Sequence, residues 1–171
     1  KISGDSLNLN DFNNPQDIFI DHQKRLYILD SGNDRIIILD KNKKVINVIE
    51  SFENQEKKDR FNDPVGMTVT SNEIIFVADK NNSRLVLLDI EGKLIKEIHK
   101  PVAEGKLPED YKFKPRKVGV DRLGKIYVIS EGEYDGIMVL NSNGEFFGFI
   151  AKGCAKPITT PNVESLAEEG I

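Results

Sequence analysis

The sequence predicts an all-β fold of the β-propeller type, and three observations lead to it. The chain has 171 residues, which is enough to bury a core of ordinary size. A pattern of four short apolar segments occurs three times, at a spacing of about 50 residues. The segments are rich in Ile, Val, Leu, Tyr and Phe, and turn signals separate them. They are too short for helices, so each repeat predicts a four-stranded antiparallel blade.

The first repeat shows the four segments most clearly. They read DIFI, RLYIL, RIIIL and VINVI, and the connections between them read DHQK, DSGND and DKNK. Connections of this length and composition suit hairpins. The first three segments are almost continuously apolar, which predicts strands that are covered on both faces. We expect this blade over residues 14–52.

The second and third repeats follow the same plan. A proline opens each repeat, at Pro15, Pro64 and Pro115, so the spacings are 49 and 51 residues. The segment RLYILDSGNDRIIILDKNKKVINVI returns first as IIFVADKNNSRLVLLDIEGKLIKEI and then as KIYVISEGEYDGIMVLNSNGEFFGFI. We expect the second blade over residues 63–100 and the third over residues 114–151.

A polar turn joins the second and third strands of each repeat. The residues that we expect to brace it are Asp30, Asn33 and Arg35 in the first repeat and Asp79, Asn82 and Arg84 in the second. Each arginine can reach back to a carboxylate or to loop carbonyls, and the asparagines and Gly32 suit left-handed backbone positions. The alternative is a ring of ligands, but recurrence in successive blades favours a structural brace. In the third repeat Ser130 and Gly136 take the Asp and Arg positions.

These segments resemble the NHL repeat. Its consensus has a proline before the inner strand, followed by strand, Asp-x-Gly-Asn-x-Arg and strand. FNNPQDIFID followed by RLYILDSGNDRIIILDKNKKVINVI matches it well, the second repeat also matches, and the third is degenerate. The resemblance covers residues 2–150 and implies a propeller with three complete blades. It implies little about activity, because such folds serve many purposes.

Partial blades are expected at both ends of the chain. The first residues read as the end of an earlier outer strand, and residues 158–171 as the start of a further blade. Residues 160–171 are also similar to a short stretch of sulfatases, but the metal-binding and nucleophile segments of those enzymes are missing from the sequence. Three blades do not close a ring, since propellers have about 4–8. Two copies could therefore associate, or the chain could belong to a larger propeller.

Composition disfavours several classes of function. The net charge of −4 argues against a nucleic-acid partner, which normally requires a basic excess. No apolar segment is long enough to form a membrane-spanning helix. A disulfide within the chain is excluded because Cys154 is the single cysteine, and no G-x-S-x-G motif marks a serine nucleophile.

The sequence gives little support for a metal site. His22 lies in a predicted turn and His99 at the end of an outer strand, so they are not spaced as a ligand pair. Asp17, Asp79 and Glu131 could supply oxygen ligands to calcium, but no EF-hand spacing accompanies them. We therefore predict no cofactor. The resemblance to propellers that include metal-dependent lactonases and lyases keeps such an enzyme as the alternative function.

The connections that follow the fourth strands are the most individual segments. ESFENQEKKDRFNDP and HKPVAEGKLPEDYKFKP are long, charged and different from each other. Strand directions place them on the same face as the Asp…Arg turns, and variable loops on a rigid scaffold are where specificity is built. The residues that we expect there to bind a partner are Gln16, Asp17, Arg60, Tyr111, Lys112, Arg116 and Lys117.

The sequence therefore predicts a non-enzymatic binding or scaffold propeller. Its partner would be a protein, a peptide or a glycan, recognised by the loops beside the Asp…Arg turns. Bacterial NHL-repeat proteins with similarly Asn-, Lys- and Ile-rich repeats are exported or tethered to membranes. The resemblance therefore favours an extracytoplasmic or cell-surface location.

Overall fold

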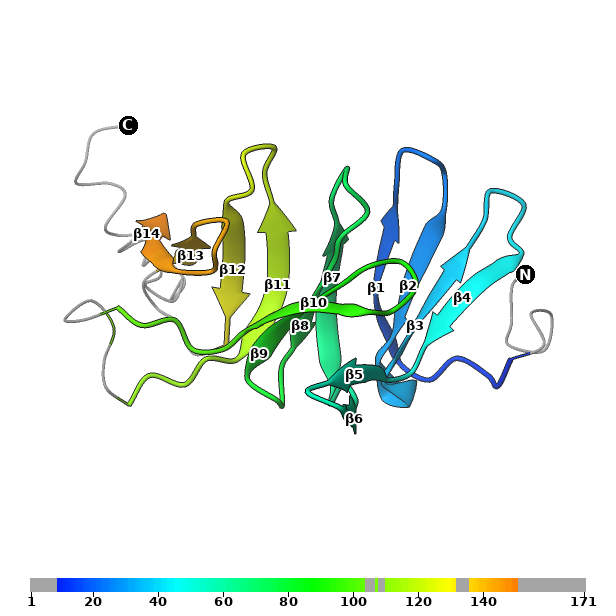
Figure 1. Ribbon diagram of the computed structural model, residues 1–171, viewed down its shortest axis with the longest axis horizontal. Coiled ribbons are helices and arrows are strands. Elements are labelled where there is room, and N and C mark those ends of the chain that lie inside the picture. The colour runs from blue at the N-terminus through cyan, green and yellow to red at the C-terminus, as the bar shows by residue number, and fades with distance from the viewer. Residues whose placement is uncertain (1–8, 104–106, 108–109, 132–135, 151–171) are drawn as a thin grey trace, which may run out of the picture.

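The computed structural model describes residues 9–103, 107, 110–131 and 136–150. Both expected partial blades and Cys154 lie outside these residues. Three four-stranded antiparallel sheets stand side by side (Figure 1), which confirms the predicted all-β class. Within the described residues there is no helix of the length and apolar character needed to cross a membrane.

Each sheet is a simple meander, in which every strand pairs with the next one along the chain. The first sheet contains β1 (Pro15–Ile20), β2 (Leu26–Asp30), β3 (Arg35–Leu39) and β4 (Val45–Ile49). The second contains β7 (Pro64–Val69), β8 (Ile75–Asp79), β9 (Arg84–Leu88) and β10 (Leu94–Ile98). The third contains β11 (Pro115–Val120), β12 (Ile126–Ser130), β13 (Ile137–Leu140) and β14 (Phe146–Ile150).

The first strands of the three sheets lie next to one another. β7 packs between β1 and β11 (Figure 1), so these strands form the inner edge of the assembly. Each pairs with its second strand through a register shift that falls between the proline and the second residue after it. A bulge of this kind bends a strand and redirects the side chain that follows. The proline in each repeat thus marks the start of a bulged inner strand.

The hydrophobic core lies between the sheets, in two main clusters. Val86 packs into the cluster between the first and second sheets, whereas its neighbour Leu85 packs into the cluster between the second and third. Successive side chains of a strand point to opposite faces, so a strand with apolar neighbours on both sides becomes continuously apolar. All five residues of β9 are buried.

The outer side of β1 departs from the sequence prediction, which concerned the first three strands of a repeat. Ile18 and Ile20 of β1 are 64% and 61% exposed, and Phe147 of β14 is 63% exposed. The expectation that the first three strands of a repeat are covered on both faces is therefore wrong for β1. The side chains of Ile18 and Ile20 alternate with that of Phe19, which packs toward the second sheet. No described sheet packs against the opposite side of β1.

A small hairpin interrupts the connection between the first two sheets. β5 (Phe52–Asn54) and β6 (Lys57–Asp59) pair antiparallel around a two-residue turn. Both turn residues have left-handed backbones, with φ of 49° at Gln55 and 63° at Glu56. Such turns usually contain Asn-Gly or Asp-Gly, and the Gln-Glu pair carries no such signal. This hairpin was therefore not predicted from the sequence.

Candidate partner-binding face

The Asp…Arg turns and the long connections share one edge of the three sheets. Figure 1 shows the 3-10 turn η2 (Ser31–Asn33), the β8–β9 turn and the β5–β6 hairpin along its lower side. The β1–β2, β7–β8 and β11–β12 turns lie along the upper side. Strand directions in the sequence predicted this arrangement. We call the lower edge the loop face.

The first turn is tied together by one buried carboxylate. The Nε of Arg35 donates to Asp30 Oδ2 at 2.8 Å, and Asn33 donates to the same oxygen at 2.8 Å. The other oxygen accepts the backbone N–H of Asn13 at 2.7 Å. The Asp30 side chain is 0% exposed and that of Arg35 is 3% exposed. The pair therefore fixes both the turn and the segment that leads into β1.

The second turn adds further carboxylates to the same plan. The Nε of Arg84 donates to Asp79 at 2.8 Å, its Nη1 donates to Asp59 at 2.6 Å, and Nη1 also bonds Glu97. Its guanidinium carbon lies 5.5 Å from the centre of the Phe52 ring. Asp59 and Phe52 belong to the β5–β6 hairpin, whereas Glu97 belongs to β10. Arg84 therefore joins the hairpin to the second sheet.

Burial and charge determine how these groups titrate. The hydrogen bond from Arg84 lowers the pKa of Asp59 to about 2, against the opposing effect of its partial burial. Burial raises the pKa of Asp79, although Asn62, Asn82 and Arg84 all donate hydrogen bonds to it. Burial would lower the pKa of Arg84, but its bonds to Asp59 and Asp79 outweigh that effect and raise it. The arginine therefore stays charged.

The backbone of these turns differs in one respect from the sequence prediction. The left-handed residues are Asp34 and Ser83, with φ of 49° and 55°, and not Asn33, Asn82 or Gly32. The two asparagines instead donate their side-chain amides to the buried aspartates of their turns. Gly32 is required for space, because a Cβ there would lie 2.5 Å from the side chain of Asn13.

The third turn retains part of this arrangement. The Oγ of Ser130 accepts the backbone N–H of Lys114 at 3.0 Å. The buried aspartates of the first two turns accept backbone N–H groups in the same way. Residues 132–135 of this turn lie outside the described residues. Serine thus supplies the acceptor but has no second oxygen to hold an arginine.

An ion pair crosses the inner strands beside the loop face. Asp17, Gly66 and Lys117 each lie two residues after the proline of their repeat. The Nζ of Lys117 donates to Asp17 Oδ2 at 2.9 Å, and the backbone N–H of Met67 donates to the same oxygen at 3.0 Å. A Cβ on Gly66 would lie 2.3 Å from the backbone oxygen of Arg116. Glycine at the middle position therefore leaves room for the first and third strands to meet.

The other predicted binding residues are dispersed along the loop face. Gln16 and Arg116 are exposed on the inner strands beside the ion pair, and Arg60 and Lys112 are exposed in the connections. The Tyr111 ring packs against the cluster between the second and third sheets, and the Lys100 amine lies 5.8 Å from its centre. The structure thus brings Asp17 and Lys117 into direct contact and spreads the other five candidates along the edge.

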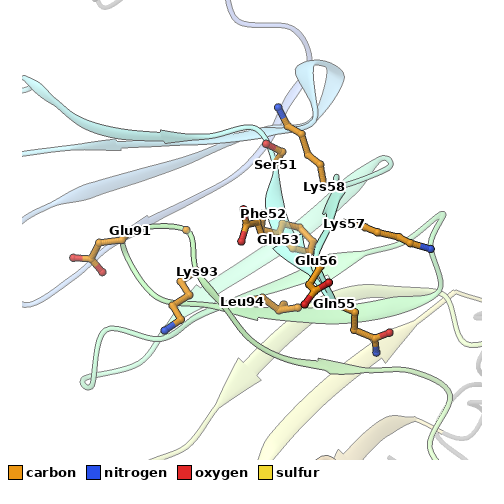
Figure 2. Close-up of a pocket in the computed structure, with 11 residues that line it drawn as sticks. Ser51, Phe52, Glu53, Gln55, Glu56, Lys57, Lys58, Glu91, Lys93 and Leu94 are labelled. Carbon is orange, nitrogen blue, oxygen red and sulfur yellow. The ribbon is translucent and has the colours of Figure 1, made fainter.

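The β5–β6 hairpin forms one wall of a groove that the sequence did not predict. The groove has a volume of about 850 Å³. Figure 2 shows the charged side chains of the hairpin on one side of it and those of the β9–β10 turn on the other. Phe52 and Leu94 are the apolar lining residues, and the charged ones are Glu53, Glu56, Lys57, Lys58, Glu91 and Lys93. The mixed charge of the connection between the first two sheets was the one feature of the sequence that could have indicated this groove.

The histidines and aspartates considered as metal ligands are exposed or are bonded to other groups of the fold. His22 and His99 are both exposed. Asp17 and Asp79 each accept hydrogen bonds from backbone and cationic groups within the fold. In the part of the chain that the structure describes, there is no group of three His, Cys, Asp or Glu residues that could hold a metal ion.

Comparison with known proteins identifies one NHL repeat and supports the fold. Residues 61–86, which include β7 and β8, match the family model of the NHL repeat. No curated protein has a sequence that matches this chain.

Several solved structures share the fold at low sequence identity. Hydrazine synthase from Kuenenia stuttgartiensis has a TM-score of 0.61 and 17% identity over 84% of this chain and 38% of its own. A protein of unknown function from Bacteroides caccae has a TM-score of 0.56 and 11% identity over 77% of this chain and 47% of its own. An inactive virginiamycin B lyase from Staphylococcus aureus, with quinupristin, has a TM-score of 0.54 and 14% identity over 78% of this chain and 40% of its own.

These likenesses concern architecture alone. The chain spans less than half the length of each of these structures. The sequence identities of these structures to the chain are too low to transfer an activity. Their shared fold agrees with the repeated sheets and with the matched repeat. The chain therefore contains a segment that matches the NHL repeat, at residues 61–86, and its sheets have the fold of a β-propeller.

Proposed function

We propose that the chain is a binding module whose loop face holds a protein or peptide partner in the groove beside the β5–β6 hairpin. The observation that carries this proposal is the anchoring of the hairpin by Arg84. That residue bonds Asp59 on β6 and Arg60 just after it, and stacks on Phe52 on β5. An anchored loop loses less conformational entropy on binding than a mobile one, so more of the contact energy appears as affinity.

The charges of the groove indicate the kind of partner. Along the hairpin the acidic Glu53 and Glu56 are followed by the basic Lys57 and Lys58, and the β9–β10 turn supplies Glu91 and Lys93 across the groove. A surface of both signs is complementary to another mixed surface, such as a protein or a charged peptide, rather than to a polyanion. A glycan partner would have fewer charges to offer, so the groove favours a polypeptide over a glycan.

Peptide display on the 171-residue chain tests this proposal. Selected peptides should bind at least about tenfold more weakly to Lys58→Glu, because one charge-assisted contact is reversed. Lys24→Glu provides the matched control, since it makes the same charge change on the exposed β1–β2 turn of the opposite edge. Deletion of residues 102–112 then measures how much the second long connection contributes to peptide binding. Equal binding by Lys58→Glu and the unaltered chain would place the partner elsewhere.

A metal-dependent lactonase- or lyase-like enzyme is the second candidate. The fold likeness to virginiamycin B lyase supports it, although it extends over only part of that enzyme. This function predicts bound calcium or zinc in the purified protein and a higher melting temperature when the ion is added. Protein that binds neither ion in calorimetry, and whose melting temperature is unchanged, would eliminate this candidate.

A further inference from the structure

A second pocket lies on the edge opposite the loop face, where the second and third sheets meet. The β7–β8 and β11–β12 turns, both on the upper side in Figure 1, supply lining residues on either side of it. Its volume is about 580 Å³, within the range of about 300–1,000 Å³ that is typical of ligand pockets. Phe76, Leu87 and Val120 form apolar parts of its lining.

The equivalent place between the first and second sheets is closed by an ion pair. Arg25 donates to Asp21 within its own turn at 2.6 Å and to Glu73 of the second sheet at 2.7 Å. Gln23 donates to the same oxygen of Glu73, also at 2.7 Å. Two side chains of the first sheet thus hold one carboxylate of the second, and the junction is spanned by hydrogen bonds.

The repeat replaces each member of this ion pair at the next junction. Counting from the prolines and turns of the repeats, Ile74 takes the position of Arg25, and Gly124 takes the position of Glu73. An isoleucine and a glycine cannot form a salt bridge, so the junction between the second and third sheets remains open and partly apolar. Leu123, beside Gly124, is 82% exposed at its rim.

Two cations stand at this open junction. Lys96 and Arg122 both line the pocket and both are exposed. The Lys96 amine donates to the backbone oxygen of Asn143 at 2.7 Å and has further donors to offer. The guanidinium of Arg122 forms no hydrogen bond or ion pair with the residues that the structure describes.

The one acidic residue of the pocket is occupied within its own turn. Asp121 accepts the backbone N–H groups of Leu123 and Lys125 with one oxygen, and the hydroxyl of Tyr127 with the other. Both of its oxygens thus accept hydrogen bonds within the turn. Lys96 and Arg122 are the charged donors that the lining offers to a ligand.

We propose that this pocket binds an acidic peptide segment through one large apolar side chain. The apolar side chain would pack against Phe76, Leu87 and Leu123, which removes exposed hydrocarbon from water. A neighbouring glutamate or aspartate of the peptide would accept hydrogen bonds from Arg122 and Lys96, because guanidinium and ammonium groups bind carboxylates strongly. This site is separate from the groove at the β5–β6 hairpin.

Fluorescence polarisation with defined peptides tests the inference on the 171-residue chain. The probe is a labelled peptide, Gly-Glu-Phe-Glu-Gly, with Gly-Lys-Phe-Lys-Gly and Gly-Glu-Gly-Glu-Gly as comparison peptides. The first should bind at least about tenfold more tightly than either of the others, since each lacks one of the two contacts. Arg122→Glu and Leu123→Asp should each reduce its binding by a similar factor.

The controls distinguish this pocket from general charge effects and from misfolding. Lys41→Glu makes the same charge change as Arg122→Glu on an exposed turn of the same edge, and should leave binding unchanged. Arg122→Glu and Leu123→Asp alter exposed side chains, so the melting temperatures of these two variants should match that of the unaltered chain. Equal binding of the three peptides, no binding of the first, or equal loss with Lys41→Glu would each overturn the proposal.

Discussion

Arg84 shows how one residue links the scaffold to the loop face. It occupies the same turn position as Arg35, and both arginines bond a buried aspartate and a loop carbonyl, but Arg84 also donates to carboxylates of β6 and β10. The sequence predicted that both arginines brace their turns, because the Asp…Arg spacing recurs. It did not predict the contact with Asp59, since that contact depends on how the unpredicted hairpin folds back onto the sheet.

Replacement of Arg84 by alanine should therefore be strongly destabilising. It leaves the 0%-exposed Asp79 carboxylate without its cationic partner, and such losses cost about 3–5 kcal/mol. Urea denaturation followed by circular dichroism would measure the change in the free energy of unfolding. Arg60→Ala, an exposed arginine of the same connection, should stay within about 0.5 kcal/mol. A loss below about 1 kcal/mol for Arg84→Ala would contradict the brace.

Asp59 should make the fold sensitive to acid. Its pKa is about 2 in the folded chain, below its ordinary value of 3.8, so folding favours the charged form. The stabilisation is complete above pH 4 and is lost as the pH falls from about 4 to about 2. Because the Asp59 side chain is 28% exposed, we expect its contribution to be only about 1 kcal/mol.

Unfolding free energies at pH 6 and pH 3 measure this effect. The loss between the two values should be smaller in Asp59→Asn than in the unaltered chain, since asparagine does not titrate. Glu53→Gln, on the exposed side of the same hairpin, should keep the full loss. If Asp59→Asn showed the same acid sensitivity as the unaltered chain, another carboxylate would be responsible.

At the scale of strands and turns, sequence and structure agree where a pattern has a physical cause. Short apolar segments and the turn signals between them identify the strands of the three sheets, because strands buried between sheets require apolar residues on both faces. The left-handed positions at Asp34 and Ser83 were missed by one residue, since Asn33 and Asn82 instead donate their side-chain amides to the buried aspartates of their turns. The Gln55–Glu56 turn was missed because neither residue favours a left-handed backbone.

The inner strands give the clearest test at this scale. Gly66→Ala would place a Cβ 2.3 Å from the Arg116 backbone oxygen, so β7 or β11 must shift. We expect a loss of about 1–3 kcal/mol in the free energy of unfolding, as in other overpacked sites. Gly119→Ala on β11, where a Cβ meets nothing within 4 Å, should change it by less than about 0.5 kcal/mol. Similar values for the two variants would show that β7 and β11 do not press against each other as described.

For the whole molecule, the repeat predicted three sheets. It did not predict which apolar side chains are exposed, because their exposure depends on which surfaces lie beside the outer strands. Phe147 and Ile150 of the third sheet are 63% and 48% exposed, and Ile18 and Ile20 of the first are exposed to a similar degree. Met67 and Val69, which take the positions of Ile18 and Ile20 in the second sheet, are only 5% and 6% exposed. Contiguous exposed apolar residues favour association with another surface.

The 171-residue chain should therefore self-associate as its concentration rises. Sedimentation velocity over a range of concentrations measures this, and Phe147→Lys with Ile150→Lys should shift the distribution toward the monomer. Val102→Lys changes an 84% exposed valine outside the sheets and should leave association unchanged. A chain that remains monomeric at every concentration would show that these faces do not bind each other.

The salt bridge between Asp17 and Lys117 has a consequence for how the chain unfolds. In most repeat proteins each unit touches only its neighbours, so stability spreads along the array like a row of coupled elements. Here the first unit is joined directly to the third, across 100 residues of sequence. Because the Lys117 side chain is 52% exposed, the bridge contributes at most about 1 kcal/mol, so it couples the first and third units directly but weakly.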